Sequence, residues 1–112
     1  MNKREELIAK YATDMADKFG VKADLDLLKK VVVGLGPSIY NADSEIVSSS
    51  DPSEVERVKT NFLIKKLGLG EESRLDEVLV DVLNRYGKSN RNKYRAVIYY
   101  MLVKHFNKES VY

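Results

Sequence analysis

A cluster of basic and amide side chains near the end of the chain is the sequence feature best suited to chemistry. Residues 88–108 contain six basic residues and no acidic one. Ammonium, guanidinium and amide groups donate hydrogen bonds to phosphate and carboxylate oxygens, so the segment predicts either an anion-binding site or ion pairs within the protein. The candidate anion-binding residues are Lys88, Asn90, Arg91, Asn92, Lys93 and Arg95.

Ion pairing within the protein is the favoured interpretation of this cluster. Arginine forms fork-shaped pairs with carboxylates in partly buried positions. The carboxylates expected to pair with it are Asp76, Glu77 and Asp81, which precede it in the chain. The alternative is an external phosphate held by Arg91, Arg95 and the backbone amides at the start of the last helix.

Nucleic-acid binding is the alternative function for the same residues. A helix ending near Gly87, followed by a helix with a basic start, predicts a helix-turn-helix-like arrangement in which asparagine and arginine read base edges. Against it, a recognition helix must expose one flank, and the last helix is apolar over most of its circumference. The pI of about 8.7 is also lower than is usual for nucleic-acid-binding domains.

The last helix is expected to begin between Ser89 and Asn92 and to continue to about Phe106, because no glycine or proline interrupts it. At about 100° per residue its apolar side chains cover well over half of its circumference, which is typical of a central helix. Arg95 should then lie partly against the core, with Arg91 on the same side. The residues expected to face solvent are Lys93, Tyr100, Lys104 and Lys108.

The seven tyrosines favour a protein partner or self-association, including a homodimer, over nucleic acid, because tyrosine is enriched at protein interfaces. The candidate interface residues are Tyr99, Tyr100 and Tyr112. The alternative is that these rings close the protein's own core. The preferred function is therefore a non-enzymatic interaction or regulatory module.

Helical periodicity runs through the rest of the chain and predicts an all-α, compact orthogonal bundle of about five helices packed around the C-terminal helix. The whole chain, 1–112, is expected to form a single domain. Asp51 should cap the third helix, with Glu54 completing a capping box. Glu71 and Glu72 should complement the dipole of the fourth. The expected helices cover residues 3–19, 24 or 26 to 35, 51–67, 73–86 and, from a start between 89 and 92, residues up to 106, with a short turn of helix after residue 42.

Enzymatic chemistry finds little support. The chain has no cysteine, and its single histidine, His105, is expected on the apolar side of the last helix. The glycine-containing segment from Gly34 to Asn41 lacks the lysine of a P-loop and the third glycine of a dinucleotide-binding loop. We expect no catalytic residue, no cofactor, no metal and no small-molecule ligand.

Composition predicts an ordinary globular protein in the cytoplasm. Hydrophobic residues make up 44% and charged residues 32%, and the absence of cysteine gives no sign of an oxidising compartment. No apolar run approaches the roughly 20 residues that span a bilayer, so no membrane insertion is expected. The net charge of +2 hides an asymmetry: residues 1–56 hold 7 basic and 11 acidic residues, and residues 57–112 hold 12 and 6.

Three blocks of the sequence resemble a known family. These are the segments 34–41 (GLGPSIYN), 61–68 (NFLIKKLG) and 86–93 with the closing residues 109–112. The chain is similar over nearly its whole length to a family of small bacterial proteins, the domain of unknown function twenty-eight fifty-three. The resemblance implies a stand-alone bacterial domain and no catalytic residues. Where the family more often has glycine, this chain has Asn107, which still tolerates a left-handed helix cap.

Overall fold

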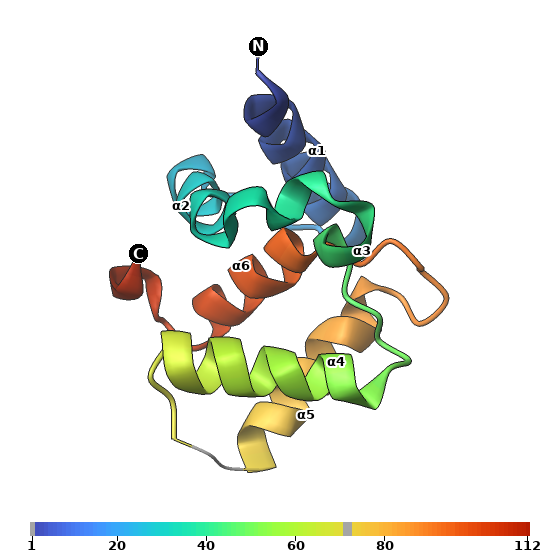
Figure 1. Ribbon diagram of the computed structural model, residues 1–112, viewed down its shortest axis with the longest axis vertical. Helices are drawn as coiled ribbons and strands as arrows, with labels where there is room; N and C mark the ends of the chain where they lie inside the picture. Colours follow the sequence, from blue (N-terminus) through green and yellow to red (C-terminus); the bar gives the residue numbers. More distant parts are fainter. Residues whose placement is uncertain (1, 71–72) are drawn as a thin grey trace.

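Helices make up the structure. The computed structural model describes residues 2–70 and 73–112, and these residues contain no strand, only an isolated bridge between Ile46 and Tyr94 (Figure 1). The predicted all-α bundle is confirmed. The elements in chain order are α1 (Lys3–Phe19), α2 (Leu25–Leu35), η1 (Gly36–Tyr40), α3 (Ala42–Glu45), α4 (Pro52–Arg57), η2 (Val58–Lys66), α5 (Ser73–Tyr86), α6 (Arg95–His105) and η3 (Glu109–Val111).

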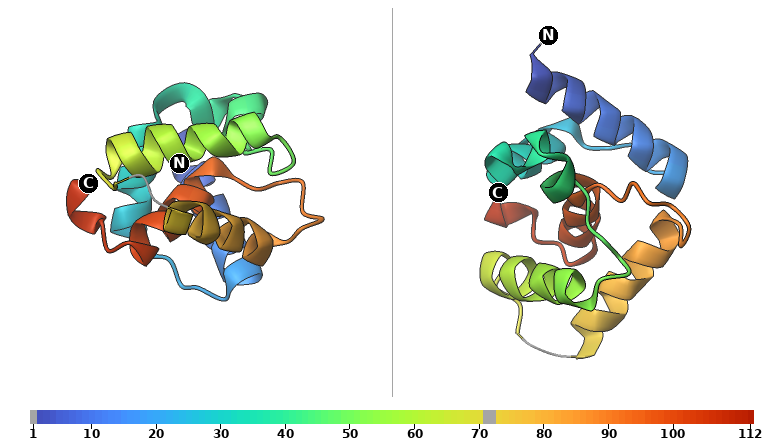
Figure 2. Two further views of the ribbon diagram at one scale, coloured as in Figure 1. Left: turned by 90° about the horizontal axis from the view of Figure 1, so that it is seen from below. Right: turned by 45° about the vertical axis from the view of Figure 1, so that its right-hand side comes forward.

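Helix α6 is the centre of the bundle, as predicted. Figure 1 shows it between α2 and α3 above and α4 below, and α1, α2, α3 and α5 all contact it. Neighbouring helices cross it in very different directions in both views of Figure 2. A helix surrounded in this way must be apolar on nearly all sides. Its buried residues are Ala96, Val97, Ile98, Tyr100, Met101, Leu102 and Val103.

Local capping sets most of the helix ends where the sequence placed them. The side chain of Asp24 accepts hydrogen bonds from the amides of the first turn of α2, and Gly20 ends α1 with a φ of 65°. Asn107 has a φ of 54°, so the left-handed cap predicted there is confirmed. Glu71 and Glu72 lie outside the described residues.

The helix predicted from residue 51 onwards changes type within its length. It is α-helical to Arg57 and continues from Val58 to Lys66 as a π-helix, in which each amide bonds five residues back. The wider turn places the Phe62 ring on that of Tyr99, with ring centroids 3.7 Å apart and planes 14° from parallel. Residue periodicity did not separate the two helix types, so the sequence predicted a uniform α-helix.

Glu54 does not complete a capping box, which corrects the prediction. Asp51 caps α4 by accepting from the Ser53 amide at 3.0 Å. The Glu54 carboxylate instead accepts a hydrogen bond from the Arg95 guanidinium of α6 and one of 2.7 Å from Arg57. This ion pair ties α4 to the central helix.

We expect Glu54→Gln to lower the free energy of unfolding by about 1–3 kcal/mol at neutral pH, because it leaves the partly buried Arg95 beside a neutral amide. Burial alone would raise the pKa of Glu54, but the hydrogen bonds and charges of Arg95 and Arg57 outweigh it and hold that pKa below its ordinary value. The stabilisation is therefore complete above the unfolded-state pKa of about 4.3 and is lost as the pH falls through the lower folded-state pKa.

Urea denaturation of the wild type and the variant at a series of pH values measures this difference. It should stay constant from about pH 7 to pH 5 and shrink below about pH 4. Glu109→Gln is the matched control, because its exposed pair with Lys104 has an N to O distance of 3.6 Å and should contribute about 0.5 kcal/mol or less. A Glu54→Gln difference independent of pH would contradict the ion-pair explanation.

Candidate binding surfaces

The predicted anion-binding cluster does not open the last helix. Helix α6 starts only at Arg95, and residues 87–94 form a loop that protrudes from the bundle (Figure 1). Tyr94 is extended, because its amide bonds to the Tyr86 hydroxyl at 3.2 Å and the neighbouring Lys93 carbonyl accepts from the Val47 amide at 2.9 Å. The helix-turn-helix-like arrangement predicted for this segment is therefore wrong. Within the loop the Asn90 side chain accepts from the Asn92 amide at 3.0 Å.

Arg95 is paired inside the protein, as the favoured interpretation predicted, but with a different carboxylate. Its guanidinium bonds to Glu54, to the Ser44 carbonyl at 2.9 Å and to the Tyr99 hydroxyl at 3.3 Å. Arg95 does not pair with the carboxylates of α5, which we expected as its partners. Arg91 was predicted on the core side and is exposed in the loop.

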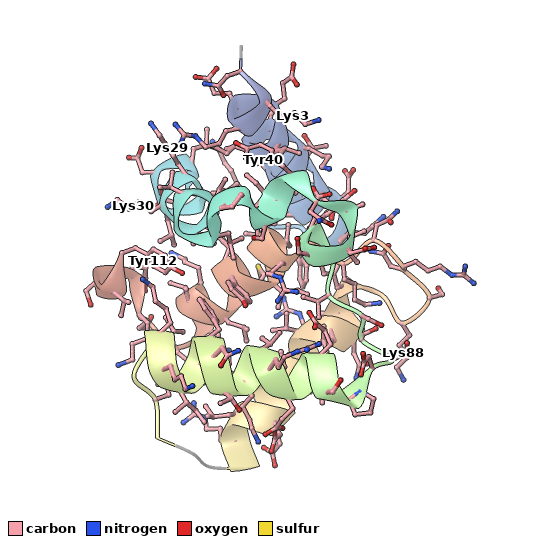
Figure 3. The ribbon with its side chains drawn as sticks, viewed as in Figure 1. Lys3, Lys29, Lys30, Tyr40, Lys88 and Tyr112 are labelled. Atoms are coloured by element: carbon pink, nitrogen blue, oxygen red, sulfur yellow. The ribbon has the colours of Figure 1, made fainter. Side chains whose placement is uncertain are left out.

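The two lysines of the cluster have opposite environments. Lys88 is exposed (Figure 3), whereas Lys93, predicted to face solvent, is only 2% exposed. The prediction for Lys93 assumed that the residue belongs to the last helix and assigned its direction at about 100° per residue. It is wrong because Lys93 precedes α6 and lies in the loop. The prediction for His105 also fails, because its side chain is exposed rather than on the apolar side.

The three candidate interface tyrosines also separate. Tyr100, predicted to be exposed, is 1% exposed, and its hydroxyl accepts a hydrogen bond of 2.8 Å from the Asp24 amide. Tyr99 is half-buried and is stacked on Phe62. Tyr112 lines a surface groove. Tyr100 is therefore a core residue and cannot contact a partner.

The groove at Tyr112 combines an apolar floor with a basic rim. It lies between α2, the end of η2 and the C-terminal segment, with a volume of about 610 Å³. Figure 3 labels Lys29, Lys30 and Tyr112, which lie together on the left of the view. We call this surface the basic groove, and its main residues are Lys29, Lys30, Val33, Lys66, Val111 and Tyr112.

Tertiary packing holds the floor of the basic groove in place. The ring of Tyr112 lies close to Gly34, where a Cβ would come within 3.4 Å of its Cε1 atom, and the Lys66 ammonium lies 4.9 Å from the ring centroid. Burial raises the pKa of Tyr112 to about 12. Val33 remains 50% exposed, and among the described residues Asp26 is the one that brings a side-chain carboxylate to the groove. The groove therefore offers apolar contact surrounded by positive charge.

A second surface has the opposite character. The outer face of α5 carries an exposed valine, Val80, at 50% exposure, with carboxylates one helical turn before it and beside it. The Asp76 carboxylate also pairs with the Lys59 ammonium at 3.2 Å. We call this surface the acidic ridge, and its residues are Asp76, Glu77, Val80, Asp81 and Asn84.

Sequence reasoning missed both surfaces, although part of the signal was present. The positions of Lys29, Lys30 and Val33 lie opposite the buried stripe of α2, so an exposed valine between lysines was visible in the sequence. That Lys66 and Tyr112 would join them depends on the packing of three distant segments. The described residues contain no group of three metal-ligating side chains, and no helix among them is long and apolar enough to cross a membrane.

The fold and its surfaces define a small all-α protein with charged grooves and, within residues 2–70 and 73–112, no metal-ligating cluster. Residues 10–110 match the family model described as "Protein of unknown function (DUF2853)". Because the match covers most of the chain, the protein belongs to this family, and the resemblance seen in the sequence is confirmed. A comparison with curated proteins gives no match.

Removal of the Tyr100 hydroxyl tests its assignment to the core. Tyr100→Phe leaves the partly buried Asp24 amide without its acceptor, so we expect the free energy of unfolding to fall by about 1 kcal/mol. Tyr40→Phe, at an exposed tyrosine, should change it by less than about 0.5 kcal/mol. Both values come from urea denaturation, and an equal effect of the two substitutions would count against the assignment.

Proposed function

We propose that this protein is a non-enzymatic interaction module of the bacterial cytoplasm that associates with further copies of itself. The basic groove of one copy binds the acidic ridge of the next. One observation carries the proposal: the chain exposes a valine surrounded by lysines on one surface and a valine surrounded by carboxylates on another. Each surface supplies what the other lacks.

The charges on the two surfaces complement each other. The groove presents the ammonium groups of Lys29, Lys30 and Lys66, and the ridge presents three carboxylates around Val80. Charge complementarity steers association and fixes the register of an interface, whereas exposed ion pairs contribute only about 0.2–1 kcal/mol each. Contact of Val80 with Val33 and Val111 supplies the apolar part. We therefore expect association that is reversible and weakened by salt.

The placement of the two surfaces sets the geometry of assembly. In the right-hand view of Figure 2, α2 and the C-terminus lie at one edge of the molecule and α5 at the other. A contact between two different surfaces is heterologous, so a dimer leaves one groove and one ridge open for further copies. Assembly then proceeds to chains or closed rings rather than stopping at a symmetric dimer.

Two complementary variants test the proposal. Lys29→Glu with Lys30→Glu and Lys66→Glu reverses the groove and keeps the ridge, and Glu77→Lys with Asp81→Lys reverses the ridge and keeps the groove. We expect each variant alone to be monomeric in sedimentation velocity, because its own two surfaces now carry the same charge. A mixture of the two variants should associate again, because the unchanged ridge of one can bind the unchanged groove of the other. Mixtures of each variant with the wild type then test the two surviving surfaces separately.

In those mixtures the surviving surface of each variant caps wild-type assemblies. The ridge of the groove variant binds an open wild-type groove, and the groove of the ridge variant binds an open wild-type ridge, so both shorten the distribution of wild-type oligomers. The control for the groove variant replaces three exposed lysines elsewhere, Lys3, Lys18 and Lys22, by glutamate, so its net charge changes by the same amount as in the groove variant. It should assemble like the wild type.

A wild type that stays monomeric at every concentration, at low salt, would overturn self-association. Fluorescence anisotropy with labelled duplex DNA then tests the alternative function. Binding that the groove variant loses and the lysine control keeps would assign the basic groove to nucleic acid.

A further inference from the structure

The protein buries two lysines and treats them in opposite ways. Lys59, 8% exposed, places its ammonium 3.4 Å from Glu56 and 3.2 Å from Asp76. Lys93 is buried more deeply, and among the described residues its ammonium pairs with no carboxylate. The Lys93 ammonium donates a hydrogen bond of 2.5 Å to the Asn90 carbonyl. A buried ammonium without a counter-charge is costly, so Lys93 lacks the compensation that Lys59 has.

Lys93 lines a pocket whose other polar residues are all uncharged or basic. The pocket has a volume of about 320 Å³ and lies between the loop before α4, the last turns of α5 and the loop before α6. Lys88 brings a second ammonium, and the hydroxyls and amide of the remaining residues add further donors. None of the described residues that line the pocket carries a side-chain carboxylate. The polar residues of the pocket are Ser49, Ser50, Asn84, Lys88 and Lys93.

We propose that this pocket binds a phosphate group, either as inorganic phosphate or at the end of a small organic molecule. A phosphate dianion supplies the missing counter-charge, and its oxygens can accept from two ammonium groups, two hydroxyls and an amide at once. A carboxylate, with two oxygens and one charge, would satisfy fewer of these donors. The proposal departs from our expectation of no small-molecule ligand, because helical periodicity placed Lys93 on the side of the last helix that faces solvent.

The rest of the pocket wall is apolar. This part of the wall determines whether inorganic phosphate or an alkyl phosphate binds more tightly. Val55, Val80 and Leu83 are its apolar lining residues. A short alkyl group attached to phosphate would contact these side chains, whereas inorganic phosphate would not. Burial lowers the pKa of Lys93, and a bound phosphate should raise it again by favouring the charged ammonium.

Isothermal titration calorimetry of the full chain with inorganic phosphate and with propyl phosphate, at constant ionic strength, tests the proposal. We expect saturable binding of both ions to the wild type, and tighter binding of propyl phosphate if the apolar wall takes part. Lys93→Met should weaken binding about tenfold or more, and Lys88→Met should weaken it less, because Lys88 is exposed. Lys22→Met, at an exposed lysine elsewhere, should bind like the wild type.

Thermal unfolding distinguishes a lost site from a lost fold. Lys93→Met replaces an unpaired buried charge with an apolar side chain of similar length, so without phosphate it should unfold at the same temperature as the wild type or higher. Phosphate should raise the unfolding temperature of the wild type and leave that of Lys93→Met unchanged. Equal binding by wild type and folded Lys93→Met, or no saturable binding by the wild type, would overturn the proposal.

Discussion

The pairing of Arg95 with Glu54 is the contact on which the arrangement of the other elements depends. Arg95 is the first residue of α6. Its guanidinium donates hydrogen bonds to Glu54 of α4, to the Ser44 carbonyl of α3 and to the Tyr99 hydroxyl of α6 itself. A partly buried arginine needs several acceptors at fixed positions, so α3 and α4, which supply two of them, are held in one register relative to α6. In the same arrangement the Phe62 ring of the π-helical segment stacks on the ring of Tyr99. The Arg95 guanidinium thus fixes the positions of α3 and α4 relative to α6.

Charge in this protein is distributed by packing rather than by position in the chain. The basic second half of the sequence is not one basic surface: Arg95 is paired internally, Lys93 is buried and Lys66 joins two lysines from the acidic first half. The result is a basic groove and an acidic ridge on different sides of the molecule. These surfaces support our proposal of self-association, and the buried Lys93 supports a phosphate site that shares Val80 and Asn84 with the acidic ridge.

Much of the fold could be predicted because its signals are local. Asp24 and Asp51 cap helices at the residues where their carboxylates can reach backbone amides, and Gly20 and Asn107 adopt left-handed conformations that end helices. The central position of α6 followed from its apolar circumference. The site residues were harder to place, because a helix start shifted from about residue 90 to Arg95 changes the direction of every side chain before it.

The sequence by itself determined the all-α class, most helix boundaries, the central helix and the family, because these depend on caps, periodicity and residue pattern. Tertiary structure alone decided that Tyr94 is extended, since the Val47 amide binds this segment from a distant part of the chain and the Tyr86 hydroxyl binds it from the end of α5. It also decided that Lys93 is buried, that Glu54 pairs with Arg95, and that Tyr112 meets Lys66. These contacts join residues far apart in sequence, so no local pattern of residues specifies them.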